Sequence, residues 1–174
     1  MRLFYAVGNV LYFVPMAISI VIIAPMLVIA APFMPLYWRY NFARTWTRFN
    51  LWTLRWLCGI DMDIQGHENI PDEPVIVFCK HQSTWETFYL NAYFPTPVFV
   101  AKQELLWIPI FGWSMKVLRY ITVDRGARRA AIESMCRQAR DRLDDGLNII
   151  IFPEGTRKAF GEKPNYKIGG AVMA

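Results

Sequence analysis

The chain has 174 residues, of which 55% are hydrophobic, and a formal net charge of +5. The basic excess is confined to the N-terminal third, because the chain from Asp61 onward carries equal numbers of basic and acidic residues. A nucleic-acid-binding domain would carry its excess on the folded part, so these numbers argue against nucleic acid as a partner and favour an anionic membrane surface.

The first predicted element is residues 3–38, which contain no charged residue before Arg39. A helix needs about 20 apolar residues to cross the hydrocarbon layer, so the segment is long enough to span it. Its prolines allow either one kinked span or a hairpin of two short helices that dips into one leaflet. We favour the single span. The four prolines are Pro15, Pro25, Pro32 and Pro35.

Residues 37–58 place aromatic rings between arginines. Such a mixture suits the headgroup layer and the cytoplasmic face of a membrane. A helix packed on its own domain would also be rich in aromatic residues, and both roles can hold on different faces. The composition changes near Cys58, so we divide the chain into a membrane anchor with an interfacial segment (1–58) and a mixed domain (59–174).

The three cysteines, Cys58, Cys79 and Cys136, follow no metal-ligand or redox spacing. We expect reduced side chains in a domain on the cytoplasmic side, with neither a metal ion nor a cofactor. His67 falls in a surface turn with no ligand spacing around it.

Short apolar runs alternate with helical patterns after the break. Four buried strands are predicted at 74–79, 97–101, 120–123 and 148–152. A helix should run from Ala127 to Gly146, with an apolar stripe that includes Met135 and Ala139. Strands alternating with helices indicate an α/β domain with a central, mostly buried sheet.

Polar clusters follow three of these strands, where open α/β sheets place their ligand sites. His81 follows the first, Asp124 and Arg125 follow the third, and residues 154–157 follow the fourth. The sequence therefore predicts one pocket to which the three clusters contribute.

His81 and Glu86 suit the activation of a hydroxyl nucleophile. An imidazole titrates near neutral pH and can take the hydroxyl proton, and a carboxylate on its far nitrogen fixes the tautomer. The pair can meet only if His81 lies in a turn before the helix, with Ser83 as the N-cap. Ser83 and Glu86 also read as a capping box, in which Glu86 binds the helix start. No Gly-x-Ser-x-Gly motif surrounds Ser83, which argues against a serine hydrolase.

The other two clusters suit an anion. Arg125 at a helix start is either a solvated side chain or a phosphate ligand, and Asp124 suits a cap of that helix. The turn Glu154-Gly155-Thr156-Arg157 combines close backbone approach, a hydroxyl and a guanidinium, as an oxyanion-binding turn requires.

These motifs, in this order, resemble the 1-acylglycerol-3-phosphate acyltransferase family. Further similar segments are Ala101–Leu105 with Pro109 and Gly112, and Tyr166–Gly169. The resemblance covers roughly residue 60 to the end. It implies a glycerolphosphate-acyltransferase-like α/β domain that transfers an acyl group from acyl-CoA or acyl-carrier protein to a lysophospholipid, with membrane lipids around it.

The resemblance also implies roles for individual residues. His81 would deprotonate the acceptor hydroxyl and Glu86 would orient His81. The acceptor phosphate would be bound by Arg125, Glu154, Gly155, Thr156 and Arg157, with Lys102 as a helper.

Three features depart from the family pattern. Glu86 stands where aspartate is usual, and Thr122 stands where an aromatic residue is common. The sequence ends at Ala174, before the family's fourth hydrophobic motif, so we expect the C-terminal part of the domain to be missing. Alternatives in function are another lysolipid acceptor such as lyso-ornithine lipid, a thioesterase, or a membrane-anchored remnant that binds lipid without turnover.

Overall fold

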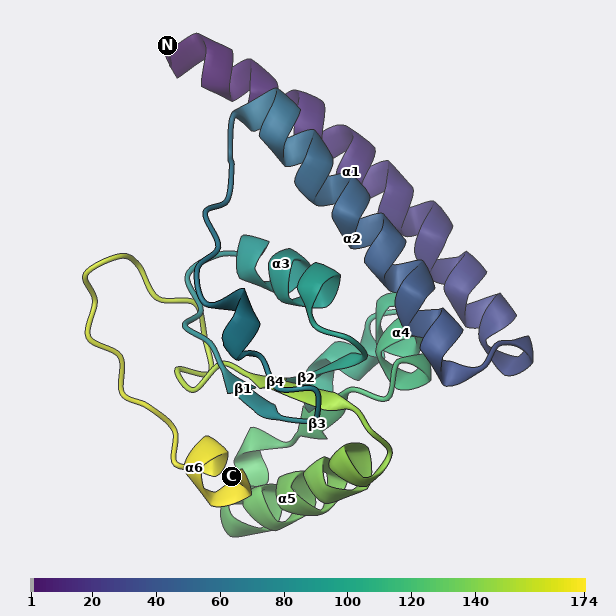
Figure 1. The fold of residues 1–174 in the computed structure, drawn as a ribbon, viewed down its shortest axis with the longest axis vertical. Coiled ribbons are helices and arrows are strands. Elements are labelled where there is room, and N and C mark those ends of the chain that lie inside the picture. Colours follow the sequence, from purple (N-terminus) through teal and green to yellow (C-terminus); the bar gives the residue numbers. More distant parts are fainter. Residues whose placement is uncertain (1) are drawn as a thin grey trace.

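The computed structural model describes residues 2–174, with the backbone alone for 2–6 and 128. A parallel four-stranded sheet in the order β1-β4-β2-β3 carries helices on both faces, and a long helical hairpin lies along one side (Figure 1). The strands are β1 Ile76–Phe78, β2 Pro97–Lys102, β3 Ile121–Val123 and β4 Asn148–Ile151. The α-helices are α1 Arg2–Ala30, α2 Leu36–Cys58, α3 Trp85–Tyr93, α4 Phe111–Val117, α5 Arg128–Asp144 and α6 Gly169–Met173. Short 3₁₀ turns cover Ala31–Phe33, His67–Asn69, Gln103–Trp107 and Arg125–Ala127.

The predicted α/β fold with a central sheet is confirmed. Apart from Lys102 at the end of β2 and Asn148 at the start of β4, the strands consist of apolar and β-branched residues. Val98, Ile121, Ile149 and Ile150 have no exposed surface at all. Helix α5 covers one face through Met135 and Ala139. Parallel strands need such covering on both faces, because neither face can meet water.

Helix α3 covers the other face of the sheet. Its Leu90 packs with Phe94 against Phe99 and Ile150, whereas Phe88 and Ala92 on its far side contact α2. The helix therefore fills the space between the sheet and the hairpin (Figure 1).

The N-terminal segment forms a hairpin, but not the one the prolines suggested. Helix α1 runs unbroken through Pro15 and Pro25, and the chain turns at 31–35 before α2 returns beside it (Figure 1). Each internal proline removes one helical hydrogen bond, which an apolar helix with a packed neighbour tolerates. Within the described residues, Val7–Phe33 is the one helical stretch long and apolar enough to cross a membrane.

The two helices are antiparallel and held by polar contacts. Trp46 Nε1 donates to Ser19 Oγ at 2.9 Å. At the end of the hairpin away from its turn, a Cβ added to Gly8 would lie 2.4 Å from the Leu57 carbonyl oxygen. Only glycine therefore allows α1 and α2 to lie this close together. Helix α2 then ends at Gly59, whose φ of 67° closes the last turn.

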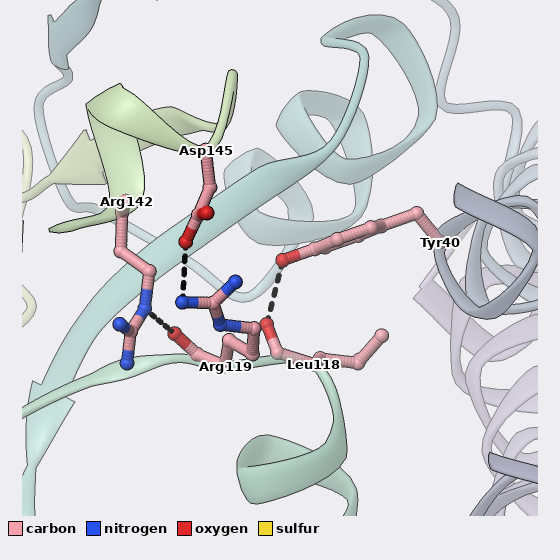
Figure 2. Close-up of polar contacts among 5 residues, drawn as sticks. All are labelled: Tyr40, Leu118, Arg119, Arg142 and Asp145. Carbon is pink, nitrogen blue, oxygen red and sulfur yellow. Dashed lines mark hydrogen bonds and ion pairs between the residues drawn. The ribbon is translucent and has the colours of Figure 1, made fainter. Parts of the chain in front are cut away.

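The N-terminal half of α2 is fixed to the domain by hydrogen bonds to backbone carbonyls, of which Figure 2 shows the one from Tyr40. Buried Tyr40 donates its hydroxyl to Leu118 O at 2.6 Å, and Arg142 from α5 donates to the next carbonyl, Arg119 O, at 2.8 Å. Arg44 Nη2 donates to Phe94 O at 3.0 Å. These carbonyls precede β2 and β3, so the hairpin turn lies at the amino ends of the strands.

The aromatic segment packs on the domain, as one of its two predicted roles requires, and it also has exposed rings. Tyr40 and Trp46 face inward, and Trp46 meets Phe88 edge to face with ring centroids 5.4 Å apart. Trp52 and Trp56 are 58% and 71% exposed on the outer side. The rings thus divide between packing on the domain and the surface of α2.

Candidate active site

The candidate site lies at the carboxyl edge of the sheet. Because all strand pairs are parallel, their carboxyl ends share one edge, as the sequence pattern required. Gly155 follows β4 with a φ of 66°, and a Cβ added there would lie 3.3 Å from Arg125 Nη2. The guanidinium of Arg125 thus lies over the 154–157 turn.

His81 lies in the loop before α3, as predicted. Its imidazole stacks on Phe152 with ring centroids 4.0 Å apart and an interplanar angle of 15°. The backbone N–H of Lys158 donates to His81 O at 2.8 Å, which binds the loop after β4 to the loop after β1. The two motifs are therefore held together by both side-chain stacking and a backbone bond.

Glu86 caps the start of α3 in this structure. Its Oε1 accepts from the backbone N–H of Gln82 at 3.0 Å, and its Oε2 accepts from Ser83 N at 2.9 Å and Ser83 Oγ at 2.8 Å. The helix starts at Trp85 after Thr84, and Ser83 Oγ accepts from Trp85 N at 3.0 Å. Thr84 already has helical dihedral angles and makes no side-chain cap bond, so Ser83 is the residue that caps the helix, as predicted.

The expected bond between His81 and Glu86 is not formed in this arrangement. Among the described residues the buried Nδ1 of His81 has no hydrogen-bond partner. The charge of Glu86 nevertheless raises the pKa of the His81 imidazole, and a carboxylate has about four acceptor positions. Capping the helix and accepting from His81 therefore do not exclude each other.

The electrostatic surroundings keep His81 neutral near pH 7. Burial lowers the pKa of the imidazole below its usual 6.5; Glu86 and Glu154 act in the opposite direction, and Arg157 adds to the lowering. A neutral imidazole has a free lone pair and can accept a proton, as a general base must.

Glu154 differs from its predicted role. Its side chain is 3% exposed, and both carboxylate oxygens are buried without a partner among the described residues. Carboxylate oxygens without exposed surface are not accessible to a ligand in this arrangement. Gly155 donates its N–H to Phe152 O at 2.9 Å, so this amide is also engaged within the turn. The parts suited to bind an anion are therefore Arg125, Thr156 and Arg157, which are exposed.

Lys102 ends β2 directly beside Val123, the residue before Asp124 and Arg125. Its exposed ammonium belongs to the same edge of the sheet, although no bond joins it to the other described site residues. Asp124 caps the following turn by accepting from Gly126 N at 2.8 Å, as predicted.

The sequence pattern offered no reason to place Phe152 or Lys80 at this site. Phe152 was treated as part of a strand, and only the structure shows its ring under His81. Lys80 and Tyr166 line, with Glu154, a pocket of about 360 Å³ beside the β1 and β4 ends. In the part of the chain that the structure describes, no three His, Cys, Asp or Glu side chains are grouped as metal ligands would be.

Comparison with known proteins decides the family. The sequence model of the acyltransferase family matches residues 61–174. The chain belongs to this family. A 1-acyl-sn-glycerol-3-phosphate acyltransferase from Pseudomonas aeruginosa is 36% identical over 97% of the chain, and one from Limnanthes alba is 34% identical over 68%. The chain covers 66% of the first relative's length and 42% of the second's.

A solved structure from this family has the same fold. The 1-acyl-sn-glycerophosphate (LPA) acyltransferase PlsC from Thermotoga maritima aligns with 99% of the chain and 69% of its own, with a TM-score of 0.74 and 24% identity. The alignment includes the N-terminal hairpin as well as the sheet, so both parts belong to the acyltransferase fold.

Proposed function

We propose that the chain transfers a fatty acyl group from acyl-CoA or acyl-carrier protein to the free hydroxyl of 1-acylglycerol-3-phosphate, giving phosphatidate. The observation that carries the proposal is that a neutral, partly buried His81 lies at the same edge of the sheet as Arg125 and Arg157. A base for a hydroxyl and guanidinium groups for a phosphate match the two ends of this acceptor. The names of the relatives agree with this acceptor.

In the proposed step His81 takes the proton of the acceptor hydroxyl as its oxygen attacks the thioester carbonyl carbon. The new C–O ester bond forms, the C–S bond breaks, and the leaving thiolate takes the proton from the imidazolium. Glu86 stabilises the imidazolium by its charge. No acyl-enzyme forms, and no cofactor takes part.

The test is to incubate membranes that carry the chain with labelled acyl-CoA and a panel of lysolipids. We expect label in phosphatidate when 1-acylglycerol-3-phosphate is supplied. Label in another diacyl lipid would assign a different acceptor, such as lyso-ornithine lipid. Free labelled fatty acid without a lipid product would indicate a thioesterase, and bound lysolipid without any product would indicate a remnant that only binds.

The guanidinium cluster gives a prediction for the acceptor. Arg125→Ala and Arg157→Ala should each lower kcat/KM for the acceptor about ten- to a hundredfold, since a charge-assisted contact contributes about 1.5–3 kcal/mol. The donor KM should change little. Arg140→Ala, an exposed arginine on α5, is the matched control. An effect confined to the donor KM would assign the cluster to the thioester donor instead.

The pH profile gives a second prediction. Activity needs neutral His81, so kcat/KM should rise with pH through the His81 pKa, and the midpoint should lie below 6.5. Arg157 lowers this pKa and Glu86 raises it. Arg157→Ala should therefore move the midpoint up, and Glu86→Gln should move it down. Equal midpoints in the unaltered chain and both variants would show that another group causes the loss of activity at low pH.

We further propose that the hairpin lies in one leaflet on the cytoplasmic side, with α1 toward the lipid. Most of α1 is exposed and apolar, whereas α2 contacts the domain along its length, through Arg39 and Tyr40 at one end and Leu54 and Cys58 at the other. A hairpin crossing the membrane would draw these domain contacts into the lipid. This arrangement supports the leaflet hairpin over the single span.

A labelling experiment distinguishes the two arrangements. Phe33 at the hairpin turn is 86% exposed, so Phe33→Cys in a variant without the native cysteines offers one thiol. We expect no reaction with a membrane-impermeant maleimide added outside intact cells. Labelling from outside would establish a crossing. Labelling after the cells are opened with detergent checks that the thiol is reactive.

A further inference from the structure

A second cavity lies apart from the candidate active site, between α2 and α3. It has a volume of about 340 Å³ and is closed on one side by the segment after α2. Its walls include Arg48, Leu51, Trp52 and Arg55 of α2, Asp61 of the following segment, and Ala92 and Tyr93 of α3. None of these residues belongs to the His81, Arg125 or 154–157 clusters. We name this cavity the α2–α3 groove.

The charges in the α2–α3 groove favour an anion. Arg48 and Arg55 are seven residues apart on α2, so they lie on the same side of the helix, about 10 Å apart along its axis. Arg55 Nη2 is 3.1 Å from Asp61 Oδ2, and both side chains are largely exposed. Arg48 forms no ion pair with any described residue. The lining thus carries one positive charge beyond its internal pair.

The remaining walls suit the glycerol backbone and first methylenes of a lipid. Leu51 and Ala92 are buried at the floor, and Trp52 and Tyr93 are partly exposed at the rim. Tryptophan and tyrosine rings favour the layer between headgroups and acyl chains. The groove also opens on α2, the helix that pairs with the lipid-facing α1.

We propose that the α2–α3 groove binds a diacyl phospholipid of the membrane by its phosphate, independently of acyl transfer. Arg48 holds the phosphate, Arg55 assists it, and the rings contact the glycerol region. Because Asp61 competes with the phosphate for Arg55, it weakens the binding. The inference does not rest on the proposed acyltransferase reaction, since it uses no residue of that site.

The test measures lipid retained by the full chain in maltoside micelles, by native mass spectrometry with diacyl phosphatidylglycerol. Arg48→Gln with Arg55→Gln should weaken retention at least about tenfold, the usual scale for losing a charge-assisted contact. Asp61→Asn should strengthen it. Arg140→Gln removes the same charge from α5 and should change nothing. All variants alter exposed side chains, and equal melting temperatures confirm folding.

Three further arms identify the ligand and its place. Diacylglycerol, which lacks the phosphate, should not be retained, and inorganic phosphate should not displace the phospholipid. His81→Ala with Arg125→Ala should bind the phospholipid as the unaltered chain does. Displacement by inorganic phosphate, equal loss in Arg140→Gln, or loss only in the His81 and Arg125 variant would each overturn the inference. The last outcome would place the lipid in the candidate active site.

Discussion

Replacing His81 by alanine is expected to lower kcat for acyl transfer by a factor of about 10²–10⁴. The proposed base is the imidazole that stacks on Phe152 beside Arg125 and the 154–157 turn, and alanine leaves no group there to take the hydroxyl proton. The acceptor KM should change much less, because the guanidinium groups remain. Kinetics with labelled acyl-CoA and 1-acylglycerol-3-phosphate measure both quantities.

The second histidine provides the control for this variant. His67 lies in an exposed turn and contacts Tyr93 edge to face at 6.3 Å, so His67→Ala should keep full activity. A His81→Ala protein with an unchanged melting temperature and normal kcat would remove the base from the proposed mechanism.

Glu86→Gln is expected to separate the two roles of that carboxylate. The glutamine carbonyl can still accept from the backbone N–H groups of Gln82 and Ser83, so the melting temperature should stay near normal. The neutral amide cannot stabilise an imidazolium at His81, so activity should fall by orders of magnitude. Thermal unfolding and initial rates on the same preparation give the comparison.

Glu86→Asp supplies the matched variant. It keeps the charge, and the family usually has aspartate at this position, so substantial activity should remain. A Glu86→Gln protein that is both stable and fully active would leave Glu86 as a helix cap alone, which is the role its present hydrogen bonds serve.

The sheet and its edge could be predicted because local signals and burial agree there. Ile149 and Ile150 lie in an apolar run that is typical of a buried strand. Gly146, with a φ of 76°, follows the end of α5 where the helical pattern stopped. Parallel order then placed His81, Arg125 and Arg157 at one edge. The strand pattern and the parallel order together were enough to predict where these motifs lie.

Other features depend on contacts between distant segments, which no local pattern encodes. The return of α2 along α1 rests on pairs such as Gly8 with Leu57 and Ser19 with Trp46. The burial of Glu154 follows from how the 154–157 turn meets neighbouring loops, whereas its motif suggested an accessible ligand. The position of Phe152 under His81 likewise requires the two loops to be joined.

The hairpin also limits how far the candidate site can move relative to a membrane. Leu27 of α1 and Tyr40 of α2 share one apolar cluster with Val98, Ile121 and Ile149 of the sheet. A domain on a flexible linker samples a range of heights above a membrane, with a breadth set by linker length. Here the helices are part of the hydrophobic core, so the depth of His81 relative to α1 is fixed. In the proposed leaflet arrangement, lipid substrates would reach the site by lateral diffusion. Trimming the hairpin would remove part of the hydrophobic core.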